Sequence, residues 1–194
     1  MTEQAFIEGL IVIGTAFWIT IPAYLPNSCA VIFGGGTPMD FGKSMKDGRR
    51  ILGKGKTWRG FFGGALAGIG IGLLQLTIAF NFDPDNLWGF GSFSDALFII
   101  ALLAFGAMLG DALGSFIKRR RGQKPGAPSP GLDQYDFLIG AWLLVIIFQT
   151  HWFYSNFVEG IHIVGLIAIL IITPLLHKAV NIIGYKTGKK DVPW

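Results

Sequence analysis

The amino-acid sequence predicts an all-α integral membrane protein with five transmembrane helices and a polar cavity at its cytoplasmic side. Of the 194 residues, 52% are hydrophobic and only 14% are charged, whereas an ordinary soluble domain has roughly 25% charged residues. Apolar runs of the length that a bilayer requires, about 20 residues, recur along the chain. The basic residues are confined to alternate connections between these runs. Together these observations exclude a soluble globular enzyme.

Five apolar runs fit this architecture, and the fourth of them is the shortest. Pro174 lies in the fifth run and is expected to kink or end a helix near its last turns. The longest connection is too short to bury a core of its own. Residues 1–194 are therefore predicted to form a single polytopic membrane domain with functional cytoplasmic loops at about 26–57 and 118–134. The expected spans cover residues 5–25, 58–80, 95–117, 135–152 and 157–183.

The distribution of charge predicts the orientation in the cell membrane. All 16 Lys and Arg residues lie between the first and second spans, between the third and fourth, or at the end of the fifth. The positive-inside rule then places the N-terminus outside and the C-terminus in the cytoplasm. The acidic leader predicts that the first span is not a cleaved secretory signal. The outer side carries acidic residues only: Glu3, Glu8, Asp83, Asp85, Asp95 and Glu159.

Glycines recur at four-residue spacing in the second and third expected spans. Such stripes let two helix backbones approach closely in lipid. We therefore expect these two spans to be tight antiparallel neighbours. The stripes consist of Gly60, Gly64, Gly68 and Gly72 in one span and of Gly106, Gly110 and Gly114 in the other.

Three acidic residues are candidates for catalysis and for metal binding. Asp111 lies inside the third span, where an unpaired carboxylate costs at least about 2.5 kcal/mol. A site facing a water-filled cavity is the default interpretation, and an ion pair with a loop arginine is the alternative. Asp133 and Asp136 open the fourth span on one helical face, and Asp133 is also a candidate N-cap. Three carboxylates at one depth predict a Mg²⁺ site, completed by water and phosphates.

The basic loops predict a phosphate site beside these acids. Lys56, Thr57 and Arg59 lie where the second span begins, and a helix N-terminus favours bound phosphate. In the other loop the candidates are Lys118, Arg119 and Lys124, although attraction to anionic lipid would need the same charges. Nucleic acid is a poor partner for two short loops pressed against a membrane. The weaker candidates in the first loop are Asn27 and the turn-forming Gly35, Gly36 and Thr37, for which a plain flexible loop is the alternative.

No arrangement of Ser, His and Asp suited to nucleophilic catalysis is apparent. His151, His162 and His177 have no metal-ligand spacing and are interpreted as structural or interfacial. The lone Cys29 has no nearby base and is expected to be inert. Metal-assisted phosphoryl or nucleotidyl transfer to a lipid suits the acids and cations, because such reactions depend mainly on positioning and charge neutralisation.

Two separated motifs resemble the CTP-dependent phosphatidate cytidylyltransferases, and within them the archaeal branch, the CDP-archaeol synthases. Arg59 and Gln134 stand where the bacterial and eukaryotic enzymes have Glu and Arg, and this chain is shorter than theirs. The motifs are Lys56-Thr57-Trp58-x-Gly60-x-x-Gly63-Gly64, then Gly110-Asp111-x-x-x-Ser115-x-Ile117-Lys118-Arg119, Lys124 with Gly126, and Pro130-Gly131-Leu132-Asp133-Gln134-x-Asp136.

The resemblance implies the reaction of CTP with 2,3-di-O-geranylgeranylglyceryl phosphate to give CDP-archaeol and pyrophosphate, with Mg²⁺ as cofactor. In that reaction Asp111, Asp133 and Asp136 would hold the metal, and the catalytic set would also include Lys118. The expected partners are CTP, the isoprenoid glycerol phosphate and the membrane; a homodimer is left open. Phosphate oxygens would be neutralised by Lys56, Thr57, Arg119 and Lys124, with a hydrogen bond from Ser115.

Two other classes of function stay open at this stage. One is another CTP- or CDP-dependent lipid phosphotransferase, such as a polyprenol kinase or a CDP-alcohol phosphotransferase. The other is a non-catalytic transporter or scaffold whose basic loops bind anionic lipid. The tail chemistry of the lipid rests on the resemblance alone, because apolar spans look alike whether they accept isoprenoid ethers or acyl esters.

Overall fold

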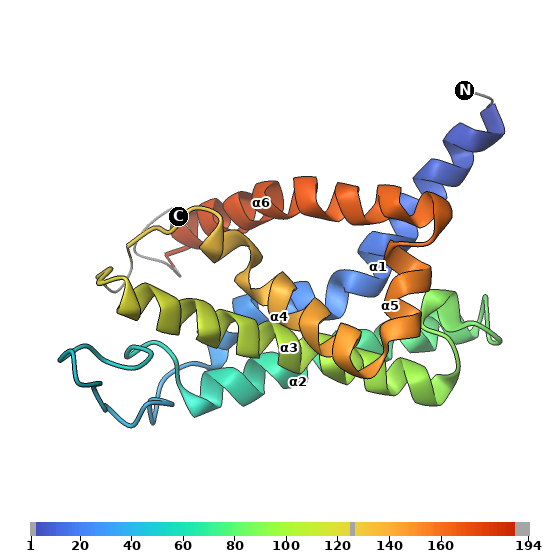
Figure 1. The fold of residues 1–194 in the computed structure, drawn as a ribbon. Helices are drawn as coiled ribbons and strands as arrows, with labels where there is room; N and C mark the ends of the chain where they lie inside the picture. Colours follow the sequence, from blue (N-terminus) through green and yellow to red (C-terminus); the bar gives the residue numbers. More distant parts are fainter. Residues whose placement is uncertain (1–2, 125–126, 189–194) are drawn as a thin grey trace.

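The computed structural model describes residues 3–124 and 127–188, and these are helical without any β-strand. This confirms the all-α class. Two isolated β-bridges occur, both in the long loop between the first two helices. The helices are α1 (Glu3–Phe33), α2 (Trp58–Phe80), η1 (Leu87–Gly89), α3 (Phe93–Arg120), α4 (Leu132–Phe148), α5 (Thr150–Phe157), η2 (Gly160–His162) and α6 (Ile163–Lys186), as Figure 1 shows.

Four segments of the described chain are long and apolar enough to cross a membrane: Glu3–Phe33, Trp58–Phe80, Leu87–Arg120 and Gly160–Lys186. The expected fourth span, 135–152, is not one helix. The backbone leaves the helical conformation at Gln149, with φ −137° and ψ 48°, and so separates the 17-residue α4 from the short α5. Phe157, the expected start of the fifth span, is instead the last residue of α5.

The helices α1 and α3 continue past the C-terminal ends that the sequence predicted for them. The first runs to Phe33 instead of ending at residue 25, and the third runs to Arg120 instead of 117. Asn27, Lys118 and Arg119 therefore lie on helices and not in loops. By contrast, α2 covers Trp58–Phe80, which is the predicted range.

Pro22 of α1 and Pro174 of α6 are tolerated because a side chain of another helix donates a hydrogen bond to the carbonyl that each proline leaves without its usual donor. Proline leaves the carbonyl four residues earlier without its helical donor. For Pro22 that carbonyl belongs to Trp18, and Gln75 of α2 donates to it at 2.7 Å. For Pro174 it belongs to Leu170, and the Tyr135 hydroxyl of α4 donates to it at 2.7 Å. Both helices thus continue through a residue that usually ends them.

The glycine stripe of α2 packs against two helices. A Cβ at Gly64 or Gly68 would lie 2.6 Å from a carbonyl oxygen of α1. A Cβ at Gly64, Gly68 or Gly72 would also lie 2.9, 2.9 or 2.4 Å from a side-chain atom of α3, in Met108, Ala104 and Ile100 respectively. This order confirms that α2 and α3 are close antiparallel neighbours. The stripe of α3 packs instead on α4, where a Cβ at Gly106 would lie 2.6 Å from the Ala141 Cα.

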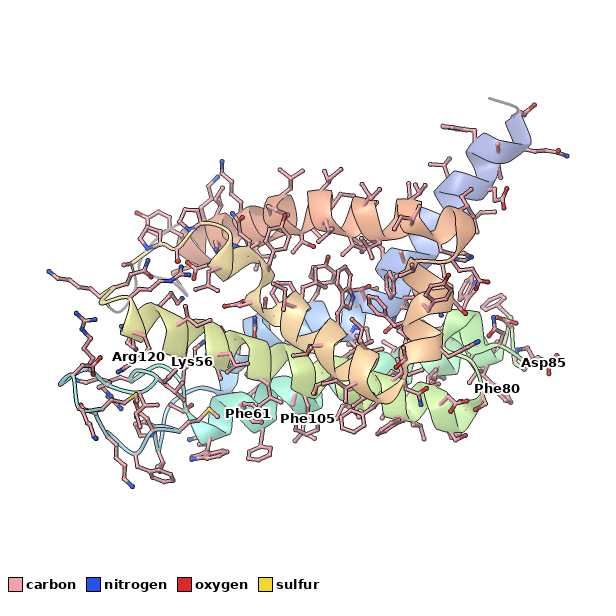
Figure 2. All side chains as sticks on the ribbon, in the orientation of Figure 1. Lys56, Phe61, Phe80, Asp85, Phe105 and Arg120 are labelled. Carbon is pink, nitrogen blue, oxygen red and sulfur yellow. The ribbon has the colours of Figure 1, made fainter. Side chains whose placement is uncertain are left out.

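Charge is sorted along the long axis of the bundle. The 34–57 loop and the connection between α3 and α4 lie at one end, which we call the basic end (left in Figure 1). Figure 2 shows Lys56 and Arg120 at this end and Phe80 and Asp85 at the opposite end. Large apolar side chains such as Ile11, Leu66 and Leu175 are more than half exposed around the sides. This surface is typical of a bundle surrounded by lipid.

The contact between α3 and α4 predicts the effect of adding one methyl group. A Cβ at Gly140 would lie 2.5 Å from the Gly110 Cα, whereas nothing lies within 4 Å of a Cβ at Gly70. We expect Gly140→Ala to lower the free energy of unfolding by about 1–3 kcal/mol because the two backbones must separate. Gly70→Ala is the matched control and should be neutral or slightly stabilising. Equal unfolding transitions for the two variants in detergent would contradict this packing.

Candidate active site at the basic end

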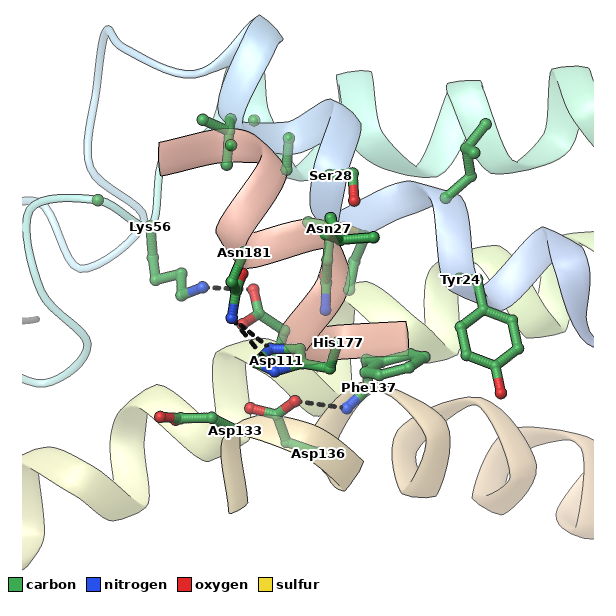
Figure 3. A pocket seen from close by; sticks show the side chains of 18 of the residues that line it. Tyr24, Asn27, Ser28, Lys56, Asp111, Asp133, Asp136, Phe137, His177 and Asn181 are labelled. Atoms are coloured by element: carbon green, nitrogen blue, oxygen red, sulfur yellow. Dashed lines mark hydrogen bonds and ion pairs between the residues drawn. The ribbon is translucent and has the colours of Figure 1, made fainter. Parts of the chain in front are cut away.

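A cavity of about 980 Å³ opens at the basic end of the bundle. Its walls come from the second half of α1, the residues that lead into α2, the second half of α3, the start of α4 and the second half of α6. All three predicted acids and two of the predicted lysines line it: Asp111, Asp133, Asp136, Lys56 and Lys118. Figure 3 shows the three carboxylates grouped on one side.

Asp111 of α3 forms an ion pair with Lys56, which precedes the N-cap of α2. The side chains are 19% and 27% exposed, respectively. The alternative partner, a loop arginine, is therefore wrong, while the expected exposure of Asp111 to a polar cavity agrees with the structure. Since an isolated carboxylate is costly at this depth, the Lys56 ammonium supplies the opposite charge that Asp111 needs beside the apolar core.

Asp133 of α4 makes a second ion pair across the cavity wall. Its Oδ1 accepts from the Lys118 ammonium at 2.6 Å, and its Oδ2 accepts from the Ser129 backbone N–H at 2.7 Å. The N-cap of α4 is Gly131, so the alternative role of Asp133 as N-cap is wrong. The bond from Lys118 ties the start of α4 to the last turns of α3, and the bond from Ser129 ties it to the connection before α4.

Asp136 is 7% exposed. Its Oδ1 accepts from the Phe137 backbone N–H at 2.7 Å. Its side chain lies so close to Gly114 of α3 that a Cβ there would be 2.9 Å from the Asp136 Cβ. Within the described residues it has no ion-pair partner. Glycine at position 114 is thus what admits this carboxylate between α3 and α4.

The donor chemistry of the cavity fits Mg²⁺. Carboxylate oxygens are the protein ligands this ion prefers, usually one or two of them completed by water and substrate phosphates. In the part of the chain that the structure describes, no group of three or more His, Cys, Asp or Glu side chains is arranged as a ready metal site. Two of the three acids instead hold lysines. A metal would therefore have to replace the lysines at these carboxylates.

The 34–57 loop that carries Lys56 is organised by a buried carboxylate. Asp40 has a fully buried side chain, pairs with Arg50, and accepts from the backbone N–H groups of Gly42, Leu52 and Gly53. Burial alone would raise the pKa of this carboxyl, but the Arg50 guanidinium and the three N–H groups outweigh it and hold the pKa well below its usual range. The loop is therefore a defined structure built around one negative charge.

Arg120, the last residue of α3, attaches this loop to the bundle. Its guanidinium donates to the Asp47 carboxylate at 2.7 Å and to the Arg49 and Arg50 carbonyls at 3.2 and 2.6 Å. The loop also pairs with the start of α2, where the Trp58 N–H donates to the Thr37 carbonyl at 3.1 Å. Neither Asp40 nor Arg120 was among the predicted site residues, because their ion-pair partners, Arg50 and Asp47, are separated from them in sequence.

The predicted nucleotide-binding residues divide into two groups. Asn27, Lys56 and Thr57 line the cavity. Thr57 caps α2 by accepting from the Gly60 N–H at 3.1 Å, as expected for a helix start. The remaining candidates do not line the cavity. One group lies in the 34–57 loop and at the start of α2: Gly35, Gly36, Thr37 and Arg59. The other lies on α3 and in the connection that follows it: Ser115, Arg119 and Lys124.

The cavity also contains residues that sequence reasoning missed. Thr173, His177 and Asn181 of α6 line it, together with Tyr24 of α1. His177 was interpreted as structural or interfacial. The signal that could have found these residues is their four-residue spacing, which places three polar side chains on one face of an otherwise apolar helix.

A bundle of apolar helices that encloses paired carboxylates and lysines in a large cavity defines an enzyme that works inside the membrane on phosphate groups. The comparison with known proteins agrees with this class. Residues 9–194 match the family described as "CarS-like: CDP-archaeol synthase", and the chain belongs to that family. It is accordingly a multi-pass membrane protein.

Curated relatives named CDP-archaeol synthase align with nearly the whole chain. The protein of Methanocorpusculum labreanum is 47% identical over 180 residues, covering 90% of this chain and 99% of its own. That of Pyrococcus horikoshii is 46% identical over 179 residues, covering 92% and 95%. A solved structure described as an intramembrane enzyme for archaeal membrane lipids biosynthesis is 33% identical, has a TM-score of 0.66, and covers 86% of this chain and 92% of its own.

The buried charge of Asp40 predicts how the loop responds to substitution. We expect Asp40→Asn to increase amide hydrogen exchange at Leu52 and Gly53 by at least about tenfold, because hydrogen bonds to a charged group are lost. Asp47→Asn is the matched control and should change exchange less, since its ion pair with Arg120 is at the surface. Unchanged protection in Asp40→Asn would contradict the role of this carboxylate.

The same carboxylate predicts a pH dependence. A lowered pKa in the folded protein means that the ionised carboxyl stabilises the loop above its usual pKa, and that this stabilisation is lost only as the pH falls through the lowered value. Protection of Leu52 and Gly53, corrected for intrinsic exchange, should therefore stay constant from about pH 8 down to about pH 5. A marked loss of protection within this range would show that another group controls the loop.

Proposed function

We propose that the protein transfers the cytidylyl group of CTP to 2,3-di-O-geranylgeranylglyceryl phosphate, forming CDP-archaeol and pyrophosphate. The family assignment supports CDP-archaeol formation. The single observation that carries the mechanism is the cavity, which joins carboxylates and lysines on one side to apolar residues of α1 and α6 on the other. Such a cavity can receive a nucleotide triphosphate and a lipid phosphate together.

The chemistry needs no general base from the protein. A phosphate monoester has a second pKa of about 6 and is largely dianionic at neutral pH, so one of its oxygens can attack the α-phosphorus of CTP directly. The new bond joins that oxygen to the α-phosphorus, while the bond from the α-phosphorus to the bridging oxygen breaks and pyrophosphate leaves. The task of the protein is to align the two phosphate-bearing substrates and to neutralise their charge.

Lys56 and Lys118 are the cations best placed for this task. Each lies in the cavity against one of the three carboxylates. We propose that Asp111, Asp133 and Asp136 hold Mg²⁺, which when bound would screen the charge of the triphosphate. The lysines then turn from their carboxylates to phosphate oxygens. The N-terminus of α2, capped by Thr57, adds a favourable dipole for the same anions.

We further propose that the chain crosses the membrane five times, with the N-terminus outside and the cavity open to the cytoplasm. The helices α3 and α6 both end at the basic end (Figure 1), so the chain must return between them. The returning segment is α4 with α5. The 17 residues of α4 span about 25 Å, slightly less than the hydrocarbon core, and α5 completes the crossing. This orientation supports a cell-membrane enzyme that takes CTP from the cytoplasm.

A homodimer of the protein stays an expectation.

The direct test is a reaction of purified protein in detergent with radiolabelled CTP, the lipid phosphomonoester and Mg²⁺. We expect CDP-lipid and pyrophosphate in equal amounts, and no product with a metal chelator. Asp111→Asn and Asp133→Asn should lower kcat/KM by at least about a hundredfold, because each removes a charge that acts on the phosphates. Release of CDP in place of pyrophosphate would instead indicate a kinase.

Asp95→Asn is the matched control for these variants. Asp95 lies in the first turn of α3, at the end of that helix opposite the basic end, and is bonded to Ser92. Its substitution should leave the reaction unchanged. Full activity in both Asp111→Asn and Asp133→Asn would overturn the assignment of the site, and absence of CDP-lipid with the unmodified protein would overturn the function.

A further inference from the structure

The helix α6 presents a polar stripe to the cavity, formed by Thr173, His177 and Asn181. These residues are spaced by four and so lie on one face of the helix. The apolar side chains of α6 in this region are largely exposed, for example Leu175 and Ile183. Polar side chains within a membrane helix are costly and usually mark a functional site. Thr173 and Asn181 are 0% and 3% exposed, so the stripe faces the protein and not the lipid.

The three members of the stripe have different partners. The Thr173 hydroxyl bonds to the Tyr24 hydroxyl at 2.6 Å and donates to the Ile169 carbonyl at 2.6 Å, so it joins α6 to α1. Asn181 and His177 contact one another: the amide Nδ2 lies 3.2 Å from the ring Nδ1. Figure 3 shows this pair reaching from α6 toward Asp111. The part of the stripe nearest the reacting groups is therefore the His177–Asn181 pair.

This contact brings nitrogen atoms of two side chains together at the cavity. The Asn181 amide Nδ2 lies 3.2 Å from the His177 Nδ1 and 3.5 Å from the Nε2. An amide N–H and a ring N–H are both hydrogen-bond donors suited to phosphate oxygens. The lysines of the cavity come from elsewhere in the chain, Lys56 from the loop before α2 and Lys118 from α3.

The position of the pair suits the lipid phosphate. The lysines lie against the carboxylates, where the triphosphate is proposed to bind. The pair lies on α6, next to apolar residues of the cavity. The apolar residues that line the cavity beside the pair are Leu176, Val180 and Ile183 of α6 with Leu25 and Val31 of α1. A lipid chain along this wall brings its phosphate to the pair.

We propose that His177 and Asn181 bind the phosphate of the lipid substrate and orient it toward the α-phosphorus of the nucleotide. This inference rests on the proposed function and assigns the phosphate subsite of the lipid within it. Asn181 orients the His177 ring, and the ring N–H together with the amide holds the phosphate oxygens that do not attack.

The test measures KM for each substrate separately in the detergent assay. We expect His177→Ala to raise KM for the lipid phosphate by about tenfold, the effect of losing one hydrogen bond to a charged group, and to leave KM for CTP within twofold. His177→Gln keeps an N–H donor at a similar position and should recover most of the loss. Asn181→Ala should act in the same direction with a smaller effect.

A binding measurement without turnover provides a second readout. Thermal stabilisation of the protein by the lipid phosphomonoester alone should be weakened in His177→Ala, while calorimetric binding of CTP should match that of the unmodified protein. His151→Ala is the control, because His151 is exposed on α5 outside the described cavity lining. Its two KM values should be unchanged.

Each other outcome overturns the proposal. A rise in KM for CTP alone would assign the pair to the nucleotide. Unchanged KM values in a folded His177→Ala protein would leave the stripe a purely structural contact between α6 and α1. Equal loss in His177→Ala and His177→Gln, with a lowered melting temperature in both, would also indicate structure only. Failure of the proposed function would be distinct, because the unmodified protein would then form no CDP-lipid.

Discussion

The structure depends on one electrostatic constraint: a carboxylate placed among apolar helices needs a cation or a hydrogen-bond donor beside it. The ion pair between Lys56 and Asp111 meets this constraint for the deepest predicted acid. Because Lys56 comes from outside the helices, a long loop has to deliver it to a defined place. The buried Asp40 and the Arg120 guanidinium fix that loop. The organisation of the basic end thus follows from the need to neutralise a few negative charges.

The same charges explain the close packing of α3 and α4. Asp136 lies against the backbone of α3, and this is feasible only where α3 has glycine, at Gly114. Lys118 then joins the end of α3 to Asp133 at the start of α4. Helices in lipid gain little from apolar contact alone, so small residues and polar bonds hold such pairs together. The charged residues that hold α3 and α4 together are therefore also residues of the candidate site.

Sequence reasoning predicted the all-α class, the bounds of α2 and the acids and lysines of the cavity, because apolar length and unexpected charge are local signals. It placed the end of α1 too early, at residue 25 and directly before Pro26, because a proline usually ends a helix, whereas α1 continues through Pro26 to Phe33. Glycine spacing identified the close-packing faces and the contact of α2 with α3, but not the contacts of the two stripes with α1 and α4, since residue spacing in one helix does not determine all of its neighbours.

The residues of α6 show a different limit. A single histidine in an apolar helix is usually structural, and His177 gains significance only from its contact with Asn181 and from the acids across the cavity. Its setting depends on how α6 packs against α1, through Thr173 and Tyr24, which are separated by most of the chain. Such long-range packing determines which polar residues share a cavity. The spacing of residues within one helix gives no information about this packing.

In the mechanism we propose, the carboxylates of the cavity bind the metal and its lysines bind the phosphates. This is tested by the affinity for CTP, determined by calorimetry with Mg²⁺ and with a metal chelator, for the unmodified protein and for Asp111→Asn. We expect Mg²⁺ to strengthen binding to the unmodified protein by at least about tenfold, or about 1.4 kcal/mol, and Asp111→Asn to remove this gain. An equal gain in both proteins, or none in the unmodified protein, would contradict this mechanism.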